Sequence, residues 1–195
     1  MATTVSEYSK TLHRINLGLG LGLPFLLFIV GYWFIEFPVP QSLAISDTIF
    51  YTLRWSLPMV PVVMWAIHNV GMSRLKCAAV KPLSGNDHLI QLQKNFLSNS
   101  LEQFLVALVC MVILSSYLES MDHFKVIPLF SVNFVLAQII FCIGYAINED
   151  YRGVGMVMTY LPTISVAAVD VYFVLTKGFA FAVGDKTTTL SDSFA

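Results

Sequence analysis

The chain alternates long apolar runs with short polar breaks. Each run approaches the roughly 20 residues that an α-helix needs to cross about 30 Å of hydrocarbon. A spanning segment must satisfy its own backbone hydrogen bonds, so a helix is the expected form of each run. The pattern predicts an all-α, polytopic membrane bundle with five transmembrane helices. The five runs are 16–36, 48–70, 98–118, 126–147 and 157–176.

The composition supports the membrane assignment. Hydrophobic residues make up 56% of the 195 residues, charged residues 12%, and the mean hydropathy is +0.73. Soluble domains carry about 25% charged residues. The formal net charge of −1 gives no reason to expect a nucleic-acid partner. We expect a polar N-terminal tail at 1–15, an extra transmembrane helix at 16–36, a four-helix membrane domain at 48–178 and a polar C-terminal tail at 179–195.

The first two runs carry local signals of their own. The first is longer than the apolar region of a secretory signal, about 7–15 residues, so we interpret it as a retained helix. Gly18 and Gly22 are spaced for close helix contact, although a weakly packed glycine-rich stretch fits the same pattern. The second run contains Pro58 and Pro61, which predict a kink.

The cysteines give no sign of a disulfide framework or a metal site. Cys77, Cys110 and Cys142 are scattered along the chain, without the spacing of a zinc site. We interpret them as small apolar residues and expect no metal.

The basic residues predict the orientation of the bundle. With a cytoplasmic N-terminus, seven Lys and Arg residues fall in cytoplasmic segments and three in segments on the other side. Cytoplasmic segments carry an excess of Lys and Arg. The sequence therefore predicts a cytoplasmic N-terminus and a luminal or external C-terminus.

Ionisable residues inside apolar runs are costly and mark candidate sites. Arg54, His68 and Asp170 lie near run ends, where they could reach the membrane surface, and Glu102 lies one turn inside the third run. Asn99 and Glu102 are three residues apart and share a helix face. They could bind a polar ligand or clamp two helices together. The predicted topology gathers further polar residues at the same membrane face, namely Tyr145, Arg152, Arg74 and Lys76.

Residues of two motifs carry a family resemblance. The segment 95–102, with Asn99 and Glu102, and the later segments 144–145, 151–155 and 161–162 resemble two motifs of the MAPEG superfamily, the membrane-associated proteins in eicosanoid and glutathione metabolism. The resemblance covers 48–178. It implies a four-helix protomer, a homotrimer, and glutathione as a cofactor at the cytoplasmic face. The cofactor site that it implies consists of Asn99, Glu102, Tyr145, Arg152 and Arg74, with Arg152 as the catalytic residue.

The extra first helix and segment 47–54 resemble one branch of that superfamily more closely than the rest. That branch belongs to the secretory pathway. This branch implies an endomembrane location such as the endoplasmic reticulum or Golgi, with the plasma membrane as an alternative. It implies membrane lipids and a membrane receptor as partners.

The sequence departs from the family at basic positions. Glutathione carries two carboxylates and one amine, so its binding favours arginines. Ser98, Asn95 and Gln138 stand where the family's enzymes commonly have basic residues. We therefore expect a degenerate glutathione site in a protein that acts through partner or lipid contacts. The alternative is a microsomal glutathione transferase or peroxidase for lipophilic substrates. A transporter would need more polar residues at mid-membrane.

Overall fold

Six α-helices and several short 3₁₀ turns form the part of the chain that the computed structural model describes, residues 2–77, 86–147 and 149–181. No strand occurs in these ranges, which confirms the prediction of an all-α bundle. The predicted C-terminal tail lies mostly outside them. The elements in chain order are α1 (Ala2–Phe34), α2 (Ile45–Ser56), η1 (Leu57–Met59), α3 (Val60–Lys76), η3 (Asp87–Ile90), α4 (Gln91–Tyr117), η4 (Met121–Lys125), α5 (Val126–Ile147), η5 (Glu149–Arg152) and α6 (Gly153–Lys177).

Four helical segments of the described chain are long and apolar enough to cross a membrane. They correspond to the first, third, fourth and fifth apolar runs, so the chain is a multi-pass membrane protein. The polar stretch before the first run belongs to the same helix, because α1 begins at Ala2. The four segments are Arg14–Phe34, His88–Tyr117, Met121–Ile147 and Gly153–Lys177.

The second apolar run is divided between two helices. The helix α2 ends at Ser56, one 3₁₀ turn follows at Leu57–Met59, and α3 continues from Val60. Pro58 lies in the turn and Pro61 in the first turn of α3. Proline donates no backbone hydrogen bond, so both interrupt the helical ladder. The predicted kink is therefore confirmed.

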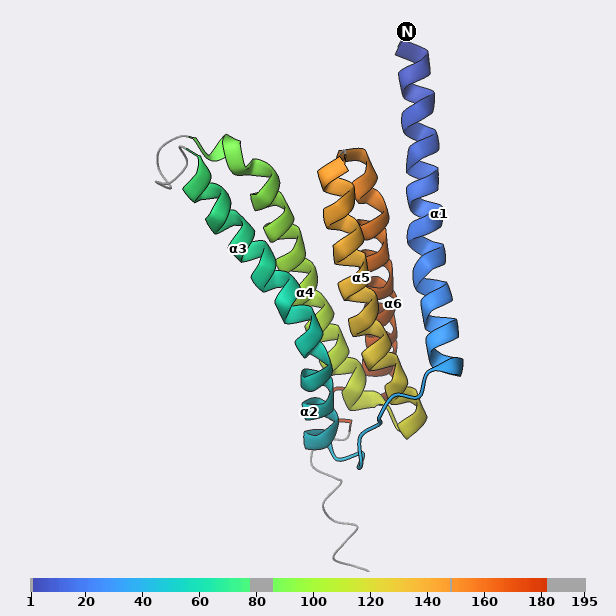
Figure 1. Ribbon diagram of the computed structural model, residues 1–195. Helices are drawn as coiled ribbons and strands as arrows, with labels where there is room; N and C mark the ends of the chain where they lie inside the picture. The colour runs from blue at the N-terminus through green and yellow to red at the C-terminus, as the bar shows by residue number, and fades with distance from the viewer. Residues whose placement is uncertain (1, 78–85, 148, 182–195) are drawn as a thin grey trace, which may run out of the picture.

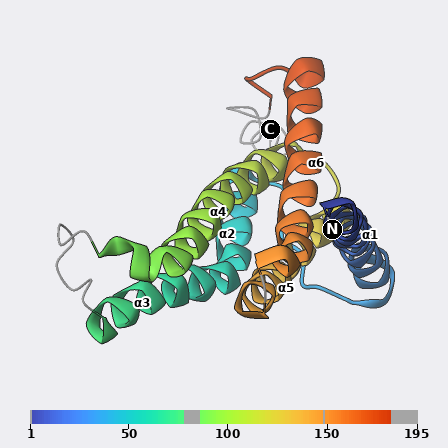
Figure 2. The ribbon, with the colours of Figure 1, turned by 90° about the horizontal axis from the view of Figure 1, so that it is seen from above.

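The helices form a splayed bundle with α1 on its outside. Figure 1 shows α5 and α6 side by side, with the α3–α4 pair leaning away from them. Seen from above in Figure 2, α1 lies apart from the α3–α4 pair, on the far side of α5 and α6. The start of α1, the end of α3, the start of α4, the end of α5 and the start of α6 share one end of the bundle, called here the N-terminal end. The α1–α2 and α4–α5 connections and the end of α6 share the other, called the opposite end.

Glycines let helices approach closely at two of the interfaces. A Cβ on Gly155 would lie 2.3 Å from the backbone nitrogen of Phe141, so only glycine permits the α5–α6 contact. On α1, a Cβ on Gly20 would lie 2.5 Å from the side chain of Val157 on α6. Gly18 and Gly22 meet no atom within 4 Å. The glycine-rich stretch therefore packs through Gly20 and not through the pair that the spacing suggested.

The interior is a cluster of large apolar side chains between α4, α5 and the two turns η1 and η4. Four of its fully buried members come from four different elements, so the cluster ties the broken second span to the rest of the bundle. These members are Met59, Met111, Phe124 and Phe134.

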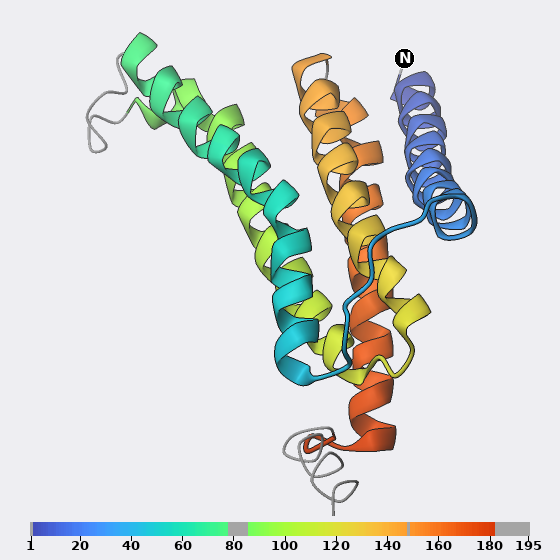
Figure 3. The same ribbon diagram turned by 60° about the horizontal axis from the view of Figure 1, so that its bottom comes forward.

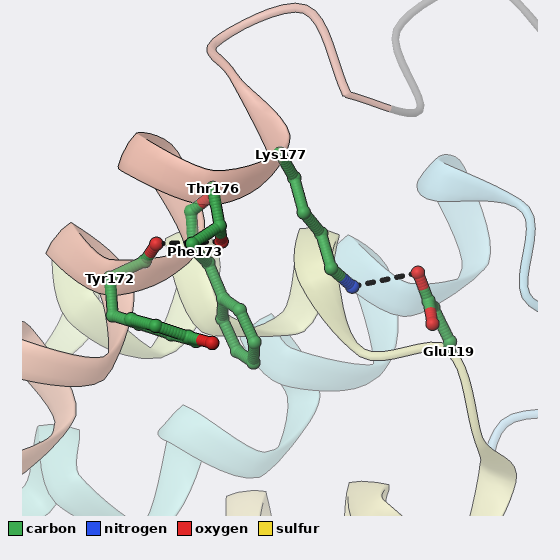
Figure 4. Close-up of polar contacts among 5 residues, drawn as sticks. All are labelled: Glu119, Tyr172, Phe173, Thr176 and Lys177. Carbon is green, nitrogen blue, oxygen red and sulfur yellow. Dashed lines mark hydrogen bonds and ion pairs between the residues drawn. The ribbon is translucent and has the colours of Figure 1, made fainter.

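An ion pair joins α6 to the α4–α5 connection at the opposite end. The Lys177 ammonium lies 2.7 Å from a Glu119 carboxylate oxygen and 5.0 Å from the centre of the Phe173 ring (Figure 4). Within α6, the neighbouring Thr176 hydroxyl donates to the Tyr172 carbonyl at 2.8 Å. The ion pair holds the last turn of α6 against the α4–α5 connection.

Candidate functional site

A groove between α4 and α6 contains two of the predicted site residues. Asn99 and Glu102 line it from α4, and Tyr160 lines it from α6. Its volume is about 270 Å³. Apolar side chains, among them Val106 and Ile164, continue it toward the middle of the bundle. The groove is therefore amphipathic. Its α4 wall is polar toward the N-terminal end of the bundle and apolar toward the middle.

A buried hydrogen-bond network lies beside the groove. The Ser100 hydroxyl donates to the side-chain oxygen of Gln138 on α5 at 2.8 Å. The Gln138 amide in turn donates to the side-chain oxygen of Gln103 at 3.0 Å. Ser100 and Gln138 are almost completely buried. The network fixes the register of α4 against α5, and Gln103 carries it to the groove wall.

Tyr145 and Arg152 meet at the α5–α6 connection. The Arg152 guanidinium donates to the Tyr145 hydroxyl at 2.5 Å and lies 5.0 Å from the centre of its ring. Gly144 makes this return possible, because a Cβ there would lie 2.6 Å from the Tyr151 carbonyl oxygen. The structure thus joins the two residues through the tight turn that follows α5.

The remaining predicted contacts do not occur among the residues that the structure describes. Glu102 accepts a hydrogen bond from the Ser98 hydroxyl at 2.7 Å and forms no ion pair with Arg152 in the described chain. Neither Arg152 nor Arg74 lines the α4–α6 groove. The half-buried Arg74 lies near the end of α3, and its Nε is buried with no hydrogen-bond partner in the described ranges. The five implied cofactor residues therefore share one end of the bundle but fall into three places.

The other ionisable candidates differ in exposure. Arg54 and His68 are exposed on the second span, as expected for side chains that reach the membrane surface. Asp170 is only 5% exposed, and neither of its carboxylate oxygens has a hydrogen-bond partner in the described chain. It continues the buried face of α6 that carries Thr159 and Thr163. The expectation that Asp170 reaches the surface is therefore wrong.

Sequence reasoning missed the α6 side of the groove and the network behind it. Tyr160 and Thr163 lie three residues apart on one face of α6, a spacing that the sequence already shows. On α4, Ser100 follows Asn99 and Gln103 follows Glu102, the two members of the predicted pair. A polar residue at each successive turn of an apolar run was the available signal for both.

The groove and the Tyr145–Arg152 pair offer different chemistry. Glu102 is the one charged residue among the described residues that line the groove, so the groove suits hydrogen-bond donors and cations over anions. The Tyr145–Arg152 pair presents a phenol and a guanidinium, groups that could stabilise an anion. The described residues contain no group of three or more potential metal ligands.

Comparison with known proteins agrees with the membrane architecture. The chain is similar to Transmembrane protein 79, or mattrin. The Bos taurus protein is 26% identical over 143 residues, which are 73% of this chain and 36% of that protein. The Mus musculus protein is 24% identical over 143 residues, with the same shares. The chain thus spans about a third of the length of the curated relatives it matches.

Other comparisons gave no match. No protein-family model matches the chain. No solved structure matches it.

Proposed function

We propose that the chain is a mattrin-like integral membrane protein of the secretory or endomembrane system. It acts through contacts with lipids or with a membrane receptor as partner, and its α4–α6 groove is a degenerate glutathione site. The likeness to Transmembrane protein 79 and the multi-pass architecture support the first part.

The observation that carries the second part is the charge of the groove. Its lining in the described chain includes the Glu102 carboxylate and no cation. A tripeptide with two carboxylates would meet repulsion there, because anion recognition depends on arginine or lysine. An amphipathic groove of this kind suits a lipid or an apolar helix whose polar end reaches Asn99 and Glu102.

The proposal includes an orientation and an assembly. The N-terminal end faces the cytoplasm, in accord with the basic bias of the sequence. The protein forms a homotrimer, as the MAPEG resemblance implies. The large apolar side chains exposed on the outer faces of α1, α4 and α6 supply area for contact with lipid or with other copies.

A second candidate function is glutathione-dependent transfer or peroxidation on lipophilic substrates. The Tyr145–Arg152 pair favours it, because a phenol hydrogen-bonded to a guanidinium could stabilise a thiolate. In that case Arg152 is the catalytic residue, and Asn99 and Glu102 hold the amine end of glutathione.

Calorimetry separates the two functions. We expect glutathione titrated into the purified protein in lipid nanodiscs to give no saturable heat. Loss of two charge-assisted contacts, at roughly 1.5–3 kcal/mol each, weakens binding by roughly two orders of magnitude or more. Saturable binding that disappears in Arg152→Ala and persists in the control Arg14→Ala would contradict the degenerate site and favour the second function.

A further inference from the structure

A second pocket lies at the opposite end of the bundle, between α2 and the connection from α1. Its volume is about 460 Å³. Figure 3 shows this connection passing across the bundle to the start of α2. The pocket is separate from the α4–α6 groove and shares no lining residue with it. The residues that matter to its chemistry are Pro38, Asp47, Phe50, Tyr51, Arg54 and Trp55.

Two opposite charges line this pocket without neutralising each other. Asp47 lies in the first turn of α2 and Arg54 in its last turn, and both are exposed. Seven residues of helix separate them by about 10 Å along the axis. They form no ion pair with each other in the described chain; Asp47 accepts a hydrogen bond from the Ser42 hydroxyl. The pocket therefore has an anionic outer end and a cationic inner end.

Aromatic rings fill the interval between the charges. The Tyr51 and Trp55 ring centres are 6.4 Å apart with planes tilted by 60°, and Phe37 packs edge-on against Trp55 at 5.7 Å. The Tyr51 hydroxyl donates to the Pro38 carbonyl at 2.8 Å, which fixes the ring and the connection together. Phe50 is 59% exposed. Aromatic faces attract ammonium groups, quaternary ones included.

The order of the groups matches one orientation of a lipid. The helix α2 begins at the end of the bundle, so Asp47 lies nearer to water and Arg54 nearer to the membrane interior. In a phospholipid the phosphate is attached to the glycerol, and the ammonium lies beyond it on the water side. A lipid of the adjacent leaflet thus brings its phosphate to Arg54 and its ammonium to the aromatic rings and Asp47.

We propose that this pocket binds the head group of a zwitterionic phospholipid, with the phosphate on Arg54 and the ammonium between Tyr51, Trp55 and Asp47. Arginine is the preferred partner of phosphate because its donors are bidentate. An anionic head group without an ammonium would leave Asp47 facing a second negative group.

Quenching of Trp55 by brominated lipids tests the site. In a Trp33→Phe/Trp65→Phe background, Trp55 is the remaining tryptophan. The protein is placed in phosphatidylglycerol nanodiscs with increasing fractions of brominated phosphatidylcholine, phosphatidylethanolamine or phosphatidylglycerol. We expect the two zwitterionic lipids to quench at several-fold lower fractions than brominated phosphatidylglycerol.

Matched variants identify the groups responsible. Asp47→Asn is expected to raise the half-quenching fraction of the two zwitterionic lipids several-fold, up to that of brominated phosphatidylglycerol, because it removes the charge that distinguishes the ammonium. Arg54→Gln weakens contact with the phosphate that all three lipids share, so it should lower the maximal quenching by each of them. Arg74→Gln at the other end and Asp122→Asn at the same end should leave both quantities unchanged. If Arg54→Gln does not fold, Arg54→Lys keeps the charge without the bidentate geometry and should lower the maximal quenching less. Equal quenching by brominated phosphatidylglycerol, or curves unaffected by both pocket variants, would overturn the proposal.

Discussion

Buried polar side chains need hydrogen-bond partners within the protein, because an unpaired polar group is costly away from water. Gln138 has two such partners, Ser100 and Gln103. The Asn133 amide donates to the Met158 carbonyl at 2.9 Å, which links α5 to α6, while its side-chain oxygen has no partner in the described chain. Each such residue fixes the rotation of one helix against another.

Removal of the Ser100 hydroxyl should expose this dependence. We expect Ser100→Ala to lower the free energy of unfolding by about 0.5–2 kcal/mol, because the Gln138 oxygen loses its donor inside the bundle. Unfolding in detergent measures the change. Ser165→Ala is the matched control, since that exposed hydroxyl bonds only its own helix at Leu161. Equal effects of the two substitutions would contradict a structural role for the network.

The sequence predicted which polar residues share a helix face better than it predicted their partners. Asn99 and Glu102 reach one groove because their three-residue spacing places them on one face. The expected approach of Arg152 to Glu102 fails within the chain, since the turn after Gly144 returns Arg152 onto Tyr145. The turn geometry and the α4–α5 register both depend on tertiary packing, which spacing along one helix does not encode.

Helix elements were predictable where length and composition decide them. The length of the apolar runs predicted the spans, and Pro58 predicted the break in the second one. The contacts of the glycines on α1 were harder to predict, because Gly18, Gly20 and Gly22 follow the same alternating pattern. Only the direction that each faces, set by the packing of α1 on α6, distinguishes Gly20.

The α5–α6 pair should be the interface least tolerant of added volume. We expect Gly155→Ala to destabilise the protein by several kcal/mol or to prevent folding, because its Cβ would overlap the backbone of Phe141 and Ala137. Gly71→Ala is the control; its Cβ meets no atom within 4 Å, and alanine is the better helix former by about 1 kcal/mol. Thermal unfolding in detergent compares the two. A Gly155→Ala variant as stable as the Gly71→Ala variant would refute this packing.

The whole molecule has two chemically different ends. The N-terminal end carries Arg74, Lys76 and Arg152, whereas the opposite end carries the aromatic pocket and the Lys177–Glu119 ion pair. The proposed orientation rests on the basic bias of the sequence alone, since the helix arrangement is the same whichever end faces the cytoplasm.

Glycosylation acceptors test that orientation. We expect an Asn-x-Ser/Thr acceptor appended beyond the C-terminus to be glycosylated in cells, and one placed before Met1 to remain unmodified. Gel mobility before and after glycosidase treatment reads both out. Modification of the N-terminal acceptor alone would reverse the orientation and place Asn99 and Glu102 on the luminal side.

The break at η1 bears on permeation. Interrupted membrane helices in transporters leave backbone carbonyls that bind ions. Here the Arg54 carbonyl accepts from the Leu57 amide and the Leu57 carbonyl from the Val60 amide, while Met59 is fully buried beside them. Pro58 and Pro61 would otherwise leave these two oxygens without their usual donors four residues on, so the second span bends with both carbonyls paired.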